Sequence, residues 1–358
     1  MKIAEIRLQR YTLELARPLT IKGHVLENRS GLILSVIDST GQIGYGEIAP
    51  LPFLHKETIE EAILCASQIT QTLIGIEIQN KINPYGDLLA ESVGVDLPPS
   101  VLFGLEMAAF DLYLQQNRVR QQLSKLKVPL CGLTSAASEN LYMDLQEMLK
   151  QGFSAIKIKV GSNSIAEDAS RINASKEIVQ NKMKLRLDAN RSWTLEEATA
   201  FCGKIGSEGI DYIEEPVKDV CDQKTFVNKT GFPLALDETL LEHRIESTSD
   251  FEHVSAFVIK PGLVGGFRHT AELIGLARRN KITPVLSSSF QSGLTIRALF
   301  LLAGEMGLAD IPAGLDTLKW FAEDCLTDQI PVVNGSVSLG HLLEQRPCFK
   351  GALLTDVG

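Results

Sequence analysis

The sequence predicts an α/β protein in which a (β/α)-type barrel follows a smaller α+β unit. Its 358 residues exceed the ~250 of a typical barrel, which leaves room for a second domain. After Pro129, short apolar segments alternate with amphipathic helical ones, a pattern typical of parallel strands covered by helices. No glycine-rich GxGxxG turn follows a first strand, which disfavours a dinucleotide-binding sheet.

An α+β unit is predicted at the N-terminal end of the chain. Residues 2–14 alternate between polar and apolar, residues 31–38 are apolar and β-branched, and a turn then leads into a third extended segment. These features predict antiparallel strands. Apolar residues recur at helical spacing between 56 and 72. A second helix is expected to begin with Ser100 as its N-cap.

Repeated βα units are predicted in the second half of the chain. Polar signatures at strand ends begin at residues 157, 188, 214, 237, 260 and 287, and they recur every 23 to 31 residues. This is the length of one βα unit, and six in a row favour a closed barrel over an open sheet. The predicted strands are 155–160, 185–189, 211–215, 233–237, 256–260 and 284–287, with 130–133 and 314–318 as candidates for the others, and the predicted helices include 165–179 and 195–205.

Composition and charge exclude several classes of function. Lys and Arg number 35 against 44 Asp and Glu, a net charge of −9, and an acidic protein lacks the basic surface that nucleic-acid binding needs. The six cysteines form no CxxC pair or disulfide-like spacing, so we expect buried or incidental thiols in a reducing compartment. The absence of an apolar signal segment and of a run of about 18 apolar residues predicts a cytoplasmic protein without a membrane partner.

Two lysines lie on one face of the predicted strand 155–160. Strand alternation places Lys157 and Lys159 together and Ile156, Ile158 and Val160 on the opposite face. Because the helix-facing side of a barrel strand is apolar, both lysines are expected to point into the barrel. Their charges are costly there unless carboxylates balance them.

The following strands supply these carboxylates. Asp188 shares a face with Arg186 and Asn190, and Glu214 and Asp237 come on the next two strands. The three acids fall at the C-terminal ends of their strands, where barrel active sites are built. Converging carboxylates repel one another, which predicts a divalent cation between them, and oxygen ligands favour Mg²⁺ or Mn²⁺.

A third lysine, Lys260, ends the next strand and is expected on the wall opposite Lys157 and Lys159. A metal-bound carboxylate substrate can accept the charge left by loss of its α-proton. A lysine beside a dication and a second lysine has its ammonium form disfavoured, so it can act as the base. The residues therefore predict a metal-dependent enzyme that abstracts a proton α to the carboxylate of a small molecule.

These motifs resemble a known family. KIK at 157–159, LDAN at 187–190, IEEP at 213–216, LDET at 236–239 and VIKP at 258–261 resemble, in this order, the muconate-lactonizing branch of the enolase superfamily. The segments GYGEIAPLP at 44–52, RLDANRSW at 186–193, SSS at 287–289 and GLDTL at 314–318 resemble its o-succinylbenzoate synthase family. The resemblance implies a modified (β/α)8-type barrel, residues 119–319, and an N-terminal α+β capping domain, residues 1–118, joined by the C-terminal segment 320–358.

The resemblance also implies a role for each polar residue of the motifs. Lys159 would be the base that takes the α-proton and the acid that returns it to the leaving hydroxide, and Lys260 would stabilise the enediolate from the other face. Asp188, Glu214 and Asp237 would bind Mg²⁺, with Mn²⁺ as a substitute, and Lys157 would tune Lys159. Asn190 and Glu238 would support the metal ligands. Ser287 and Ser288 would contact the substrate, with Arg186 as a partner behind the site.

The reaction implied is dehydration of 2-succinyl-6-hydroxy-2,4-cyclohexadiene-1-carboxylate to 2-succinylbenzoate in menaquinone biosynthesis. Two alternatives remain at this point. Racemisation of N-acylamino acids or epimerisation of dipeptides would use the same metal and lysines, and a non-catalytic barrel would only bind a ligand. Residues 17–30 are expected to form a mobile loop over the site, although they match the family poorly.

Overall fold

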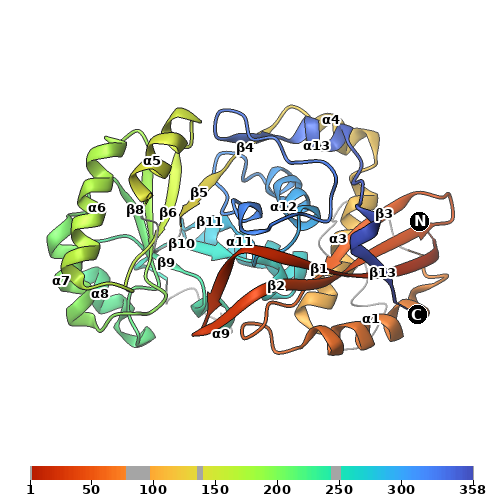
Figure 1. Cartoon of the computed structure of the whole chain (residues 1–358), viewed down its shortest axis with the longest axis horizontal. Helices are drawn as coiled ribbons and strands as arrows, with labels where there is room; N and C mark the ends of the chain where they lie inside the picture. The colour runs from red at the N-terminus through yellow and green to blue at the C-terminus, as the bar shows by residue number, and fades with distance from the viewer. Residues whose placement is uncertain (1, 78–96, 135–139, 243–250, 358) are drawn as a thin grey trace.

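The computed structural model describes residues 2–77, 97–134, 140–242 and 251–357 (Figure 1). An antiparallel sheet with its helices lies beside a curved parallel sheet, and both chain ends lie on the side of the antiparallel sheet (Figure 1). The predicted α/β architecture, a barrel with an N-terminal α+β unit, is confirmed. Of the helices in the described ranges, none is both long and apolar enough to cross a bilayer.

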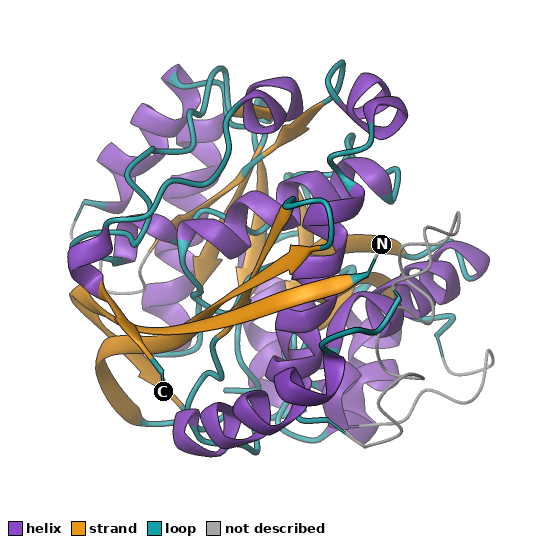
Figure 2. Cartoon of the chain, turned by 90° about the vertical axis from the view of Figure 1, so that its right-hand side faces the viewer, coloured by secondary structure: helices purple, strands orange, loops and turns teal. Residues whose placement is uncertain are grey.

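The capping part is built on a four-stranded sheet in the order β13-β1-β2-β3. Its C-terminal strand pairs antiparallel with β1, so the last residues of the chain complete the first sheet (Figure 2). Helix α3 packs so closely on β3 that a Cβ added to Gly46 would lie 1.9 Å from the carbonyl oxygen of Gly104. The elements are β1 (Ile3–Ile21), β2 (His24–Asp38), β3 (Ile43–Ile48), α1 (Ile59–Leu73), α3 (Pro99–Tyr113) and β13 (Leu354–Asp356).

The start of α3 differs from the prediction. Pro98 is the N-cap and Pro99 the first helical residue, a position that suits the fixed φ of proline. Ser100 is therefore inside the first turn, and its N–H and hydroxyl both donate to Glu57, at 3.0 and 2.7 Å. The prediction of Ser100 as N-cap was wrong by two residues, and a carboxylate from before α1 takes the capping role.

Residues 17–30 form a β-hairpin and not the expected loop. Strands β1 and β2 shift register between Glu14 and Leu19 and then pair again from Leu19 to Ile21, and the two-residue turn Lys22-Gly23 has φ of 46° and 82°, as a type I′ turn requires. The His24 ring stacks on Phe53, with ring centroids 3.9 Å apart. The prediction was wrong as to the backbone, since these residues pair as strands, while their motion and their position over the site stay predictions.

The barrel sheet is parallel throughout, in the order β11-β10-β9-β8-β7-β6-β5. Bridges from Gly314 to Ser287 and from Ala313 to Leu130 close it at an eighth position. The chain forms isolated bridges at this position and no full strand, so the prediction of a strand at 314–318 was wrong. The strands are β5 (Cys131–Thr134), β6 (Ala155–Lys159), β7 (Lys184–Asp188), β8 (Ile210–Glu214), β9 (Leu234–Leu236), β10 (Val254–Ile259) and β11 (Thr283–Leu286).

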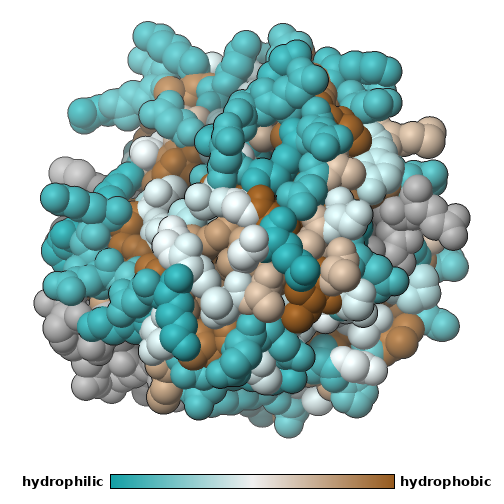
Figure 3. Space-filling model, turned by 90° about the vertical axis from the view of Figure 1, so that its left-hand side faces the viewer, coloured by the Kyte–Doolittle hydropathy of each residue, from teal (hydrophilic) through white to brown (hydrophobic). Residues whose placement is uncertain are grey.

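Helices cover the outside of the barrel. Helix α6 buries Ala169, Ile172 and Val179 in the same apolar cluster as Ile156 and Ile158 of β6. On the side where α6, α7 and α8 lie, hydrophilic side chains cover most of the edge and the hydrophobic patches are small and separate (Figure 3). The helices are α5 (Leu141–Lys150), α6 (Ile165–Val179), α7 (Leu195–Ile205), α8 (Gln223–Thr230), α9 (Thr239–Glu242), α10 (Pro261–Val264), α11 (Gly266–Arg279) and α12 (Gly293–Glu305).

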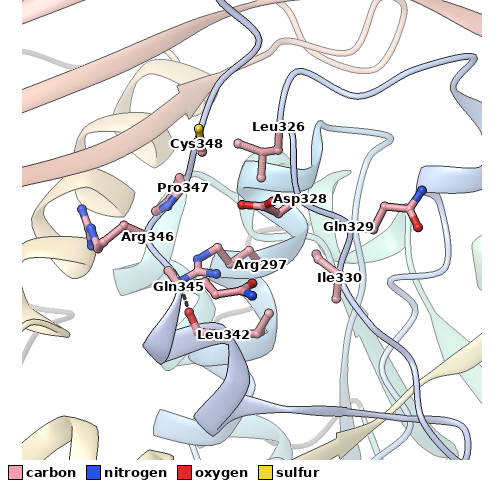
Figure 4. Close-up of a pocket in the computed structure, with 10 residues that line it drawn as sticks. All are labelled: Arg297, Leu326, Asp328, Gln329, Ile330, Leu342, Gln345, Arg346, Pro347 and Cys348. Carbon is pink, nitrogen blue, oxygen red and sulfur yellow. Dashed lines mark hydrogen bonds between the residues drawn. The ribbon is translucent and has the colours of Figure 1, made fainter.

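Shorter elements join the barrel to the capping part. Strand β4 (Lys127–Pro129) pairs antiparallel with β12 (Ser336–Ser338), next to α4 (Asn117–Leu123) and α13 (Leu339–Glu344). A cavity of about 20 Å³ lies beside α12 and α13 (Figure 4). Arg297 in its wall donates to the carbonyl oxygens of Leu342 and Gln345. Burial lowers the pKa of this guanidinium to about 10.

The capping part and the barrel also meet at a buried carboxyl, Glu106 of α3. It accepts from the N–H of Phe267 in the first turn of α11. Burial raises its pKa to about 7, although this hydrogen bond and the charge of Arg268 oppose the shift, and Glu272 adds to it. The folded state therefore holds a proton here at pH values where the unfolded chain has released it.

Stability is expected to fall as pH rises through this pKa. The contribution of neutral Glu106 is complete below the unfolded value of 4.5 and is lost by about pH 8. Relative to Glu106→Gln, the wild-type protein should lose up to about 3 kcal/mol of unfolding free energy between pH 5 and 8. Urea titrations of both proteins at these pH values measure it, and an equal difference at both would contradict the shift.

Candidate active site

The predicted charged residues lie together at the C-terminal ends of adjacent strands. Lys159 is in register with Asp188, and Asp188 is in register with Glu214. Asp237 directly follows β9 and Lys260 directly follows β10. The structure thus places these residues along one end of the barrel sheet.

Lys157 joins two of the carboxylates. Its Nζ lies 2.9 Å from Asp188 Oδ2 and 2.8 Å from Glu214 Oε1. Burial disfavours its charge, but the two negative groups outweigh this and raise the pKa of Lys157 well above its ordinary value. Lys157 is therefore an ammonium ion that holds the two acids together in this arrangement.

Lys260 pairs with the third carboxylate, Asp237, at the opposite side of the cluster. Burial alone would raise the pKa of Asp237, but the positive charges of Lys260 and Lys157 lower it. Both partners are largely buried, so the pair is only weakly screened by water. The two walls of the site thus each carry a lysine, as strand order predicted.

The three acids have the chemistry that suits a hard divalent cation, although they do not surround one point in this structure. Burial and the nearby charge of Asp188 raise the pKa of Glu214 well above its ordinary value. Its Oε2 is buried and has no hydrogen-bond partner among the described residues, which leaves one oxygen of this carboxyl group free to bind a cation. Carboxylate oxygens are the ligands that Mg²⁺ prefers. In the described ranges, no three His, Cys, Asp or Glu side chains surround one point, and here Lys157 lies between Asp188 and Glu214.

Lys159 differs from the other two lysines. Within the described part of the chain its ammonium group makes no ion pair, and its side chain is only partly buried. Its backbone is held, because Arg171 donates to its carbonyl oxygen at 2.6 Å and pairs with Asp168. Asp168 also accepts from the N–H of Gly161, which fixes the loop after β6.

Glu215 is a residue of the site that the sequence reasoning missed. It is fully buried and accepts from the N–H of Asp237 at 2.9 Å, the N–H of Thr239 at 2.8 Å and Arg191 Nε at 3.1 Å. Gln223 completes this set at 3.1 Å. The carboxylate thus fixes the backbone that carries Asp237. The double acid of the IEEP motif was the available signal.

Replacing this carboxylate should be strongly destabilising. In Glu215→Gln the amide group faces N–H donors, so buried donors lose their acceptor at a cost of about 2–4 kcal/mol. Glu242→Gln is a matched control, because Glu242 binds the same Arg191 at 2.7 Å but is half exposed, and such a pair contributes about 0–1 kcal/mol. Urea unfolding compares them, and equal losses would refute the assignment.

The predicted supporting residues divide into two groups. Asn190 lies beside the predicted ligands, since its N–H donates to Asp188 at 3.0 Å and its side chain to Glu238 at 3.2 Å. Burial and the charge of Asp237 raise the pKa of Glu238 to about 7. Arg186 instead contacts Asp211 at 2.8 Å and the carbonyl oxygen of Pro312 at 2.7 Å.

The serines predicted to contact substrate form hydrogen bonds with groups of the protein. Ser287 Oγ donates to the carbonyl oxygen of Gly314 at 3.1 Å, and Ser288 Oγ lies 2.9 Å from Thr317 Oγ1. These bonds fix the residues that follow β11 against the closing segment of the barrel. Contact of Ser287 and Ser288 with substrate stays a prediction.

Two known families match separate parts of the chain. Residues 141–343 match the family described as Enolase C-terminal domain-like, and residues 3–112 match the MenC N-terminal domain. The chain is 33% identical to the o-succinylbenzoate synthase of Pectobacterium atrosepticum, over 88% of this chain and 90% of that protein. The chain belongs to the o-succinylbenzoate synthase family of the enolase superfamily. The synthase of Yersinia enterocolitica is 32% identical over 89% of this chain and 92% of that protein.

Solved structures share the fold of this family member. The L-Ala-D/L-Glu epimerase from Bacillus subtilis matches with a TM-score of 0.80 at 22% identity, over 94% of this chain and 96% of that one. The muconate lactonizing enzyme from Pseudomonas fluorescens matches with a TM-score of 0.78 at 19% identity, over 98% and 97%. At these identities the likeness concerns the fold. The family membership indicates a catalytic enzyme.

Proposed function

We propose that this protein is a Mg²⁺-dependent hydro-lyase that dehydrates 2-succinyl-6-hydroxy-2,4-cyclohexadiene-1-carboxylate to 2-succinylbenzoate in menaquinone biosynthesis. The observation that carries the proposal is the buried cluster of Asp188, Glu214 and Asp237, with a lysine on either side, in a chain similar to o-succinylbenzoate synthases over nearly its whole length.

Asp188, Glu214 and Asp237 would hold the Mg²⁺. Bound there, the ion would supply positive charge to the substrate carboxylate and lower the barrier to loss of its α-proton. The buried, unpartnered Oε2 of Glu214 supports this assignment. A dipeptide epimerase of Enterococcus faecalis with the same fold, at a TM-score of 0.78, was solved with Mg.

The three lysines would divide the proton chemistry. Lys159 Nζ takes the α-proton from carbon and then gives a proton to the departing hydroxyl group, which leaves as water while the ring becomes aromatic. Lys260 balances, from the other side, the negative charge that develops on the substrate carboxylate. Lys157 remains an ammonium ion that orients Asp188 and Glu214.

The alternative within the superfamily is two-faced proton exchange on an N-acylamino acid or dipeptide. The fold match to the L-Ala-D/L-Glu epimerase and the lysines on two walls favour it, but those matches are below 25% identity. The two synthases named above, at 33% and 32% identity, are o-succinylbenzoate synthases, which favours dehydration. A non-catalytic barrel is disfavoured by the presence of all three acids and all three lysines.

The test is a direct assay of both reactions. With Mg²⁺ and the cyclohexadiene substrate, the folded protein should remove the diene absorbance, and chelation should stop this until Mg²⁺ is restored. Deuterium exchange into N-succinylamino acids in D₂O measures the alternative. Exchange without dehydration would replace the proposal by the racemase, and neither activity in folded, metal-loaded protein would leave only the binding role.

A further inference from the structure

A carboxylate of the capping part binds the start of a barrel helix. Glu47 at the end of β3 is fully buried and reaches the N-terminus of α12, 245 residues further along the chain. It accepts from the N–H of Ser292 at 3.0 Å, the hydroxyl of Ser292 at 2.6 Å and the N–H of Thr295 at 3.2 Å. A negative group at this point satisfies free N–H donors and suits the helix dipole.

Two further residues fix this contact from the capping side. Tyr11 of β1 donates its hydroxyl to the same carboxylate. Arg29 of β2 is buried and donates to the carbonyl oxygens of Ala49 at 3.0 Å and Pro50 at 2.8 Å, and across the interface to that of Phe290 at 3.0 Å. The capping part therefore holds the segment 290–295 by both its donors and its acceptors.

The segment held in this way is the loop between β11 and α12. It begins at Ser287 and Ser288, which the family resemblance implies as substrate contacts, and passes through Phe290 at φ 55°. A left-handed conformation is unfavourable for phenylalanine and persists only where the surroundings impose it. Arg29 binds the carbonyl oxygen of Phe290 itself and Glu47 binds the N–H of Ser292, two residues further on, so both bonds constrain this stretch of backbone.

We propose that Glu47 is a positioning residue for substrate binding: through α12 and the loop that precedes it, Glu47 sets the position of Ser287–Ser289 at the mouth of the barrel. The effect on substrate affinity rests on the proposed function, while the effect on the loop does not. If Glu47 had a purely structural role, it would act only as a buried helix cap. Glu57 is such a cap, because it binds the start of α3 within the capping part.

Glu57→Gln is thus the matched control for Glu47→Gln. Both substitutions weaken a buried carboxylate at a helix N-terminus, and both should lower the Tm. Glu47→Gln alone should raise KM for the cyclohexadiene substrate about tenfold, the loss expected from one displaced hydrogen bond, with kcat nearly unchanged. Ser292→Ala removes the barrel side of the contact and should raise KM in the same direction if Glu47→Gln fails to fold.

A second readout follows the loop itself. Trp320 packs edge-on against Phe290 at 5.9 Å, and Trp193 is the other tryptophan of the chain. In a Trp193→Phe background, Glu47→Gln should shift the Trp320 emission to longer wavelength, and Glu57→Gln should leave it in place. This measurement needs no substrate, so it stands if the proposed reaction fails.

The proposal is overturned if Trp320 emission is the same in the Trp193→Phe protein with and without Glu47→Gln. It is equally overturned if Glu57→Gln raises KM as much as Glu47→Gln does, since a general loss of stability would then explain both. Unchanged KM in both Glu47→Gln and Ser292→Ala, in a protein that turns over substrate, would also refute it.

Discussion

Lys159→Ala is expected to abolish dehydration, by about 10³-fold or more, because it removes the group proposed to take and return the proton. Mg²⁺ affinity should stay nearly unchanged, since within the described residues Lys159 makes no ion pair with Asp188, Glu214 or Asp237. Steady-state kinetics and calorimetric titration with Mg²⁺ measure the two effects separately.

The matched control is Lys184→Ala. Lys184 is the exposed first residue of β7, the strand that ends in Asp188, so its removal deletes a lysine from the barrel without reaching the site. It should retain wild-type kcat. Residual turnover in Lys159→Ala above one tenth of wild type would assign the base to another residue.

Lys260→Met is expected to slow catalysis while strengthening metal binding. Turnover should fall about 10²–10³-fold, the usual loss when one group that balances developing charge is removed. Mg²⁺ affinity should rise about tenfold, because the ammonium that pairs with Asp237 no longer competes with the cation.

Measuring kcat and Mg²⁺ affinity of Lys260→Met together tests the role assigned to Lys260. A fall in both kcat and Mg²⁺ affinity would show that Lys260 supports the ligands, and its assignment to the substrate would be wrong. Lys260→Arg is a useful control, because it keeps the positive charge beside Asp237 and should leave Mg²⁺ affinity near that of the wild type.

Much of the barrel was predictable because its strands alternate. Residues 155–160 place Lys157 and Lys159 on the inner face, and the observed β6 confirms the strand to within one residue. Helices 165–179 and 195–205 were predicted from their amphipathic pattern with the observed bounds, and Ser164 and Thr194 form capping boxes at their starts. Local patterns of this kind depend only on near neighbours in the chain.

Contacts between distant segments were not predictable in this way. Alternation predicts that Glu215 points away from Glu214, but its partners at Asp237 and Thr239 depend on how β8 and β9 align. The bond from Glu47 to Ser292 depends on docking of the capping part on the barrel. The hairpin at 17–30 was missed because its turn occupies only two residues.

The central claim, a cation site built from Asp188, Glu214 and Asp237, is tested most directly by titrating Mn²⁺ and following the free ion by electron paramagnetic resonance. The wild-type protein and Lys159→Ala should each bind one ion per chain, which Mg²⁺ displaces. Asp188→Asn, Glu214→Gln and Asp237→Asn should each lose this binding while remaining folded. One displaceable ion bound with unchanged affinity in all three variants would contradict the account.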